Sequence, residues 1–207
     1  MIFTKTPGHK LFQLLDKKCK SRYSHFKKYY AKDSKKFINK IQRDYKEFPG
    51  HVLKTIKGIK KSDYDSAVCI LRGALPYALL FEADGWNIHY LICGRVNEKV
   101  VFDKMMLRFD DTIDPGLAQI KNKRVLIIDN NSFSGNTPVR VALELKNKYD
   151  VKKPDLFLDY FCKNNIFESN RKRTNMFGKI IVASNTKVAD DEKTALVSEF
   201  LAKINNI

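Results

Sequence analysis

Cysteine and histidine are scarce in this sequence, with four of each among 207 residues. The cysteines lie far apart and form no Cys-x-x-Cys pair, a pattern typical of reduced, buried thiols rather than disulfides. The histidines show no spacing of the kind that binds zinc. The sequence therefore predicts neither a disulfide framework nor a zinc site; the residues concerned are Cys19, Cys69, Cys93, Cys162, His9, His25, His51 and His89.

Long apolar runs are also absent. No stretch approaches the roughly 20 apolar residues that span a membrane. The opening residues MIFTKTPGHKLFQLL lack the apolar segment of a secretory signal peptide. The phosphate-binding patterns GxxxxGK[ST] and GxGxxG are missing too, so any phosphate site must use another design. We expect a cytoplasmic protein without a membrane partner, and a chain that is 43% apolar and 12% aromatic can bury one core.

Acidic residues are few in the first third of the chain. Residues 1–61 contain 18 Lys and Arg against 4 Asp and Glu, whereas residues 62–207 contain 21 against 19. Nearly the whole net charge of +16 therefore belongs to the first segment. This shift predicts a basic helical extension over residues 1–61 and a core domain over residues 62–207.

Apolar residues of the extension recur every three or four positions, the period of one helical face. The pattern predicts a first helix over residues 11–30 and a second from Asp33 or Ser34 to Pro49-Gly50. A third short helix is expected to end near Ile59. The lysine-rich outer faces could be solvated, but such faces usually mix both signs of charge. The excess of lysine favours attraction of phosphate groups, either of nucleic acid or of a small substrate.

The remaining residues alternate between strand and helix patterns. Strands separated by helices predict a doubly wound, parallel α/β sheet of about five strands. In such sheets ligands bind beyond the carboxyl ends of the strands. The expected strands are 66–71, 86–93, 124–128, 156–162 and 179–184; the expected helices are 74–84, 138–149 and 190–204; the expected connections are 94–114 and 163–177.

The stretch VLIIDNNSFSGNTP, residues 125–138, joins a buried strand pattern to a run of small polar residues. Gly135 permits a tight backbone turn. Thr137 suits the N-cap of the following helix, and Pro138 suits its first position. Because the amides of this turn and the positive end of the helix converge, the stretch predicts an anion site.

The same stretch resembles the motif of the type I phosphoribosyltransferases, which bind phosphoribosyl pyrophosphate (PRPP). That motif has four apolar residues, two acidic residues, a short stretch and then Thr/Ser-Gly-x-Thr/Ser. Here the acidic pair is Asp129-Asn130, and the closing motif is Ser134-Gly135-Asn136-Thr137. Members of the family also carry a pyrophosphate-binding loop after the first core strand, often with Arg-Gly, and this chain has Arg72-Gly73 at that place.

The resemblance implies a role for each matching position. Asp129 and Asn130 would be the catalytic pair, no residue would coordinate a metal directly, and Mg²⁺ would arrive with PRPP. The 5-phosphate would be bound by Asn131, Ser132, Phe133, Ser134, Gly135, Asn136 and Thr137. Pyrophosphate would be bound by Arg72, Gly73 and Ala74. A mobile loop over residues 94–110 would offer Arg95, Lys99, Lys104 and Arg108, and the acceptor base would stack on Tyr160 or Phe161.

Three functions follow as hypotheses. The first is transfer of the phosphoribosyl group from PRPP to a nitrogen nucleophile of a small-molecule acceptor, with release of pyrophosphate. The second is a catalytically degenerate regulator that binds PRPP or a nucleotide, because Asn130 replaces an acid and supplies no charge. The third is a nucleic-acid-associated module that acts through residues 1–61. In the transferase hypothesis, residues 1–61 would instead form a hood over the active site. A homodimer is left open as an assembly.

Overall fold

The computed structural model describes residues 7–26, 50–95, 107–132, 134–161 and 167–207. Contacts divide the chain into two compact units. Unit 1 comprises residues 1–59, 76–86 and 184–207, and unit 2 comprises residues 60–75 and 87–183.

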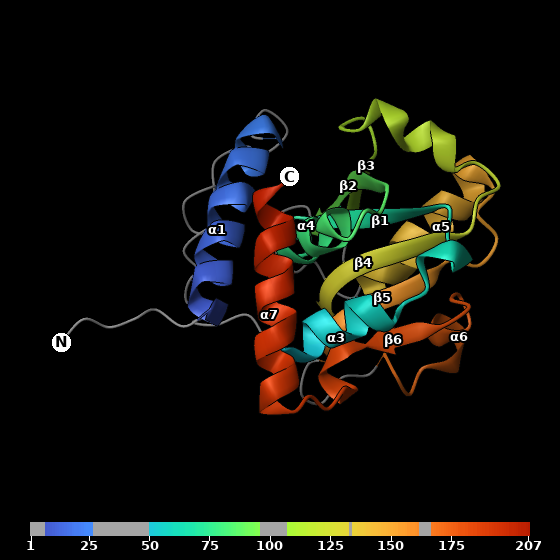
Figure 1. Cartoon of the computed structure of the whole chain (residues 1–207). Helices are drawn as coiled ribbons and strands as arrows, with labels where there is room; N and C mark the ends of the chain where they lie inside the picture. Colours follow the sequence, from blue (N-terminus) through green and yellow to red (C-terminus); the bar gives the residue numbers. More distant parts are fainter. Residues whose placement is uncertain (1–6, 27–49, 96–106, 133, 162–166) are drawn as a thin grey trace. The chain divides into compact units, whose positions relative to one another are not determined.

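Unit 2 is built on a six-stranded sheet with the order β3-β2-β1-β4-β5-β6 (Figure 1). All neighbouring strands are parallel except β3, which runs antiparallel to β2. The predicted α/β class with a parallel sheet is therefore confirmed. The strands are β1 (Ser66–Leu71), β2 (Ile88–Arg95), β3 (Leu107–Asp110), β4 (Val125–Ser132), β5 (Asp155–Phe161) and β6 (Ile180–Val182). The helices are η2 (Lys61–Asp63), η3 (Pro115–Ile120), α5 (Asn136–Tyr149) and α6 (Arg171–Thr174).

Two features of the sheet differ from the sequence prediction. β3 lies within the stretch that was expected to be a connection, and its four residues alternate too briefly to give a strand pattern. β4 continues past Ile128 to Ser132, because Asp129, Asn131 and Ser132 stay paired with β5. The polar half of the motif therefore begins on a strand, and the turn around the expected anion site starts only after Ser132.

The strand order places a switch point between β1 and β4. From β1 the chain winds to β2 on one side of the sheet, and then returns past β1 to β4 and continues to β5 and β6 on the other side. Loops leaving two such strands diverge, and ligands of open α/β sheets bind in the crevice that forms there. The loop that begins with Arg72 and the turn before α5 both leave the sheet at this point.

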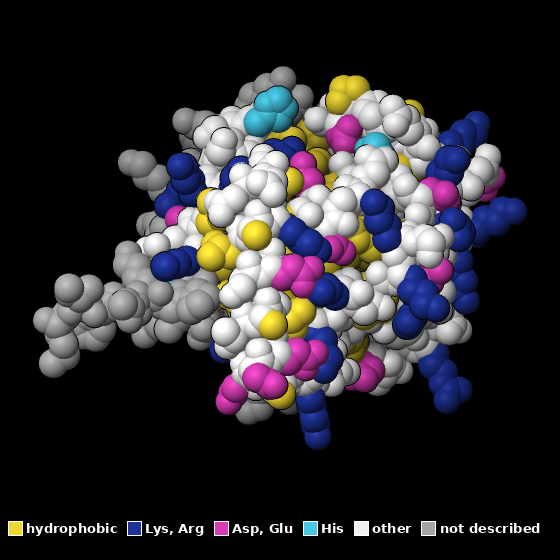
Figure 2. Space-filling model, viewed as in Figure 1, with side chains coloured by type: hydrophobic (Ala, Val, Ile, Leu, Met, Phe, Trp, Pro, Cys, Tyr) yellow, Lys and Arg dark blue, Asp and Glu magenta, His cyan; other side chains and the backbone are white. Residues whose placement is uncertain are grey.

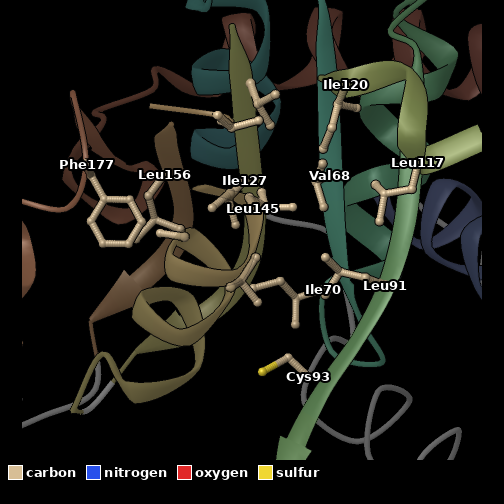
Figure 3. Packing of buried hydrophobic residues seen from close by; sticks show 14 of the residues in the cluster. Val68, Ile70, Leu91, Cys93, Leu117, Ile120, Ile127, Leu145, Leu156 and Phe177 are labelled. Carbon is tan, nitrogen blue, oxygen red and sulfur yellow. The ribbon is translucent and has the colours of Figure 1, made fainter. Parts of the chain in front are cut away.

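One face of the sheet carries the core of unit 2 (Figure 3). Alternate residues of each strand point to this face, as the two-residue period of a strand requires. α5 covers them with its apolar side and contacts β2, β3 and β4. Burying each such aliphatic side chain contributes about 1.5–3 kcal/mol. The cluster includes Val68, Ile70, Leu91, Cys93, Ile127, Leu156, Leu158, Val141 and Leu145.

Unit 1 is helical in the part of it that the structure describes. Its helices are α1 (Pro7–Phe26), α3 (Gly50–Gly58), most of α4 (Leu75–Ala83) and α7 (Asp190–Asn205). α1 and α7 run side by side (Figure 1), and α3 also packs on α7. The predicted apolar face of the first helix is buried, from Leu11 to Phe26. The predicted second helix lies outside the described residues, and α3 begins at Gly50, where that helix was expected to end.

Ion pairs link the basic helices of unit 1 to acidic residues far away in the sequence. Arg22 pairs with Glu82 at 2.8 Å, and Lys54 and Lys57 pair with Glu192 and Glu199 of α7 at 2.9 and 2.6 Å. Side chains of both signs are interspersed over α7 (Figure 2). Divided by unit, the chain carries 19 basic against 10 acidic residues in unit 1 and 20 against 13 in unit 2. The strong asymmetry along the sequence is thus nearly absent in space.

Three of the four cysteines lie within the described ranges. Cys19, Cys69 and Cys93 are buried, as the sequence predicts, while Cys162 lies outside the described residues. Within the described ranges, none of the helices combines the length and the apolar character needed to cross a membrane.

Candidate functional site

The turn between β4 and α5 forms the centre of the candidate site. α5 begins at Asn136, and its N-cap is Gly135, whose φ of 74° lies in the left-handed region. The prediction that Thr137 caps this helix is therefore wrong by two residues. Glycine adopts a positive φ without the steric penalty that a Cβ brings, so it turns the chain sharply from strand to helix.

The first turn of α5 presents main-chain amides that the helix itself does not use. The first intrahelical bond runs from the Val139 amide to the Gly135 carbonyl at 3.0 Å. Pro138 occupies the third helical position rather than the first, where its missing N–H also costs no intrahelical bond. The amides of Gly135 and Thr137 therefore remain at the positive end of a 14-residue helix, where the Asn136 amide makes only a long bond to Ser134 Oγ. We call residues Ser134–Thr137 the phosphate cradle.

Two residues from the segment after β5 hold the cradle. The Arg173 guanidinium donates a hydrogen bond to the main-chain carbonyl of Ser134. The ring of Phe167 lies so close to Gly135 that a Cβ at that position would overlap it. Phe167 is fully buried and makes edge contacts with Phe161 and Phe177. The cradle is therefore fixed by tertiary contacts as well as by its own backbone.

Asp129 lies on β4, five residues before the cradle. Its side chain is buried, and its Oδ1 accepts a hydrogen bond from the Asn130 amide at 2.8 Å. Burial raises the pKa of this carboxyl to about 7, although the Asn130 amide favours the ionised form. Among the described residues no Arg or Lys pairs with Asp129. A buried carboxyl kept without a cationic partner is the kind of group that is found at functional sites.

Asn130 brings the two predicted loops together. A Cβ on Gly73 would lie 2.8 Å from both Cγ and Nδ2 of Asn130, so this side chain packs directly on the backbone of the loop after β1. Arg72 and Gly73 are half-buried in that loop, whereas Ala74 is fully buried and its amide bonds the Ile70 carbonyl at 3.4 Å. The Arg-Gly loop and the end of β4 are therefore in direct contact, and the side chain of Ala74 is packed in the interior.

The other predicted phosphate ligands are not all directed to the cradle. Ser132 is buried on β4, and its hydroxyl has no hydrogen-bond partner among the described residues. Asn131 donates from its side-chain amide to the Tyr160 hydroxyl at 3.0 Å. Ser134 accepts a long bond from the Asn136 amide at 3.4 Å. Phe133 lies outside the described residues.

The predicted base-stacking residues differ in exposure. Tyr160 is 39% exposed and is held by Asn131, so its ring is available at the carboxyl end of β5. Phe161 points to the other side of the strand and packs against Phe167. Of the two, Tyr160 is the more exposed.

The predicted mobile loop lies largely outside the described residues, which exclude Lys99 and Lys104. Arg95 is the last residue of β2, and Arg108 lies in β3, where the two strands pair. The backbones of both arginines therefore belong to the sheet, which corrects their placement in a loop.

The sequence did not predict that Phe167 and Arg173 contact the cradle. Phe167 closes the stretch 160–167, where the resemblance puts the residues that recognise the base, and Arg173 lies in the expected connection 163–177 without a motif. The available local signal was Asn170, whose side chain accepts from the Arg173 amide at 3.2 Å and caps α6. That signal indicates a short helix but not its contact with the cradle.

Gly73→Ala is expected to weaken binding of pyrophosphate-containing ligands about tenfold with little change in the free energy of unfolding. The added methyl must displace the short side chain of Asn130, which can rotate at low cost. Titration calorimetry and thermal unfolding would separate the two effects. Gly58→Ala, whose Cβ would meet no described atom within 4 Å, is the matched control; an unaltered affinity in Gly73→Ala would contradict the role of this contact.

Comparisons with known proteins give similar solved structures but no matching family. No family model and no curated protein matches the chain. Among solved structures, it is similar to a purine phosphoribosyltransferase from Pyrococcus horikoshii Ot3, with 16% identity, a TM-score of 0.45 and coverage of 64% of this chain and 78% of that one. It is also similar to a Helicobacter pylori xanthine-guanine-hypoxanthine phosphoribosyltransferase, with 15% identity, a TM-score of 0.47 and coverage of 67% and 83%.

A third similar structure is a hypothetical protein from Neisseria gonorrhoeae with bound ppGpp, with 15% identity, a TM-score of 0.48 and coverage of 71% and 89%. Two of these three structures are phosphoribosyltransferases. Because a fold alone does not define an activity, we base the functional argument on the residues of the site.

Proposed function

We propose that this protein binds PRPP at the carboxyl ends of β1 and β4 and transfers its phosphoribosyl group to a nitrogen nucleophile. The observation that supports this most directly is the contact between Asn130 and Gly73, because it joins the Arg-Gly loop to the end of β4, the strand that leads into the phosphate cradle. A ligand with phosphates at both ends of a ribose would then lie across Asp129 and Asn130.

Each part of the site has a distinct task in this reaction. The amides of the cradle hold the 5-phosphate and so orient the ribose. The Arg72-Gly73 loop holds pyrophosphate, which leaves with the electron pair of the C1–O bond as the acceptor nitrogen bonds to C1. Positive charge develops on the ribose ring during this step, and the Asp129 carboxylate stabilises it. The acceptor is proposed to stack on Tyr160.

Mg²⁺ is proposed to bind together with PRPP. Within the described ranges no three His, Cys, Asp or Glu residues gather into a metal site. Magnesium commonly keeps several waters and relies on substrate phosphates for its other ligands. The ion would come with PRPP, and the chemistry it would supply is neutralisation of the leaving pyrophosphate.

A regulator that binds PRPP without turning it over is the second candidate. It is favoured by Asn130, which brings no charge, and by the burial of Asp129, which leaves that carboxyl only partly ionised near neutral pH. The two candidates share a ligand but differ in chemistry, so they can be separated by an assay of turnover.

Asn130→Asp is the variant that separates them. A second carboxylate beside the ribose is expected to raise turnover about tenfold, because it adds charge where the transition state is positive. Pyrophosphate release from PRPP would be measured for wild type and variant over a panel of nucleobases. Release by neither protein, despite PRPP binding, would overturn the transferase and leave the regulator.

A further inference from the structure

The contact between Arg173 and Ser134 carries a consequence for ligand binding that the sequence motif does not contain. Arg173 lies 39 positions after Ser134, on α6, and it is the one basic residue of this short helix that is not classed as exposed. Its guanidinium donates to the Ser134 carbonyl, which belongs to the first residue of the cradle. A distant arginine is therefore bonded to the backbone of the proposed phosphate site.

The geometry of a peptide bond gives this contact its effect. A trans peptide is planar, and its C=O and N–H groups point in opposite directions. Fixing the Ser134 carbonyl toward Arg173 therefore fixes the Gly135 amide toward the opposite side. The carbonyl, whose negative end would repel an anion, is turned away at the same time.

Phe167 fixes the same peptide from its other end. Its buried ring contacts Gly135, and Gly135 is held at a φ of 74°. Glycine alone could move out of this conformation easily, because it has the greatest backbone freedom of all residues. The two contacts together keep the turn in one conformation before a ligand arrives, which lowers the entropic cost of binding.

Arg173 also brings charge to the site. A guanidinium has five N–H donors and remains protonated in proteins. No carboxylate of the described residues is paired with Arg173, so its charge is not neutralised locally. The guanidinium lies on the carbonyl side of the peptide, and an unneutralised cation close to a helix N-terminus raises the affinity for an anion through its field.

We propose that Arg173 is a positioning residue for the phosphate cradle and that it acts selectively on sugar-phosphate binding. This inference rests on the proposed function, since it assigns the 5-phosphate to the cradle. It requires that loss of Arg173 weaken binding of a ribose phosphate and spare binding of pyrophosphate, which the Arg72-Gly73 loop holds.

The test is a titration of the full chain with ribose 5-phosphate and, separately, with pyrophosphate. Four proteins are compared: wild type, Arg173→Gln, Arg173→Lys and Arg171→Gln. Arg171→Gln is the matched control, because it removes one charge from the same helix at an exposed residue. Thermal unfolding of each variant reports whether the fold is retained.

Arg173→Gln is expected to weaken ribose 5-phosphate binding about tenfold or more, the effect of losing one charge-assisted hydrogen bond. Its affinity for pyrophosphate should stay within about twofold of wild type, since the other loop is untouched. Arg173→Lys keeps the charge and a hydrogen-bonding group, so its affinity for ribose 5-phosphate should lie between those of Arg173→Gln and wild type. This comparison still tests the inference if the glutamine variant folds poorly. Arg171→Gln should bind both ligands like wild type.

If Arg173→Gln lost equal affinity for both ligands, or if Arg171→Gln lost as much affinity as Arg173→Gln, the effect would come from net charge alone. Either result would overturn the inference. Wild-type affinity in Arg173→Gln would overturn it as well, while leaving the proposed function in place. Failure of wild type to bind either ligand would overturn the proposed function and this inference together.

Discussion

Asp129→Asn is expected to lower turnover by about two orders of magnitude, the usual cost of removing one preorganised electrostatic stabiliser. The amide can still accept the Asn130 N–H bond, so the backbone geometry is preserved. The lost charge acts on the transition state rather than on the ground state, so the affinity for PRPP should change much less than the turnover. Steady-state kinetics and calorimetry on the same protein measure both quantities.

The same substitution is expected to increase stability, with a defined dependence on pH. The folded-state pKa of Asp129 is raised to about 7 from 3.8, so the folded protein disfavours the charged form. Between these two values the folded state binds more protons than the unfolded state, and wild-type stability therefore falls as pH rises through this window. The Asp129→Asn variant lacks this loss. The gain in free energy of unfolding of Asp129→Asn over wild type should be absent below pH 4 and reach at most roughly 4 kcal/mol above pH 7.

Asp155→Asn provides the control for both measurements. Asp155 lies at the amino end of β5, away from the cradle, and accepts a hydrogen bond from Tyr64 at 2.6 Å. Its loss is expected to alter stability without changing turnover. Equal turnover in wild type and Asp129→Asn would exclude Asp129 from the chemistry, and a stability difference that did not change with pH would contradict its buried ionisation.

Gly135→Val is expected to abolish binding of ribose phosphates and to lower the free energy of unfolding by about 3 kcal/mol. From the sequence alone only the loss of binding is expected, with a largely intact fold. The structure adds two costs, because a β-branched residue is strained at a φ of 74° and its Cβ would overlap the Phe167 ring. Ligand titration and chemical denaturation measure the two losses separately.

The companion variants show which cost dominates. Gly94→Ala should be nearly neutral in both assays, because a Cβ on this glycine of β2 would meet no described atom within 4 Å. Gly135→Ala is expected to lower the free energy of unfolding by itself. Adding Phe167→Leu to it should recover part of that loss, since the smaller side chain leaves room for the methyl of the alanine. Full ligand affinity in Gly135→Val would be incompatible with a cradle at residues 134–137.

The parts of the site that could be predicted from the sequence are those contained in a short contiguous segment. Residues 125–137 carry a buried strand, a glycine turn and a helix start in order, so local rules place the cradle and the Asp129 carboxyl before it. The extension of β4 to Ser132 was missed, because pairing with β5 satisfies the backbone whatever the polarity of the side chains.

Contacts between distant segments could not be predicted in this way. Arg173 and Phe167 meet the cradle through tertiary packing that no local period records. The division of charge along the sequence predicted a basic extension with few acidic partners. The carboxylates that pair with Arg22, Lys54 and Lys57 come from the distant helices α4 and α7, so this prediction failed for the same reason. A linear division of the chain assigns these acids to the core, whereas contacts place them in unit 1.

The most direct test of the central claim is a calorimetric titration of the full chain with PRPP in the presence and absence of Mg²⁺. We predict saturable binding at one site per chain, strengthened by Mg²⁺ and lost in the Gly135→Val variant while Gly94→Ala retains it. Absence of saturable binding by the wild-type protein under both conditions would contradict the assignment of a PRPP site.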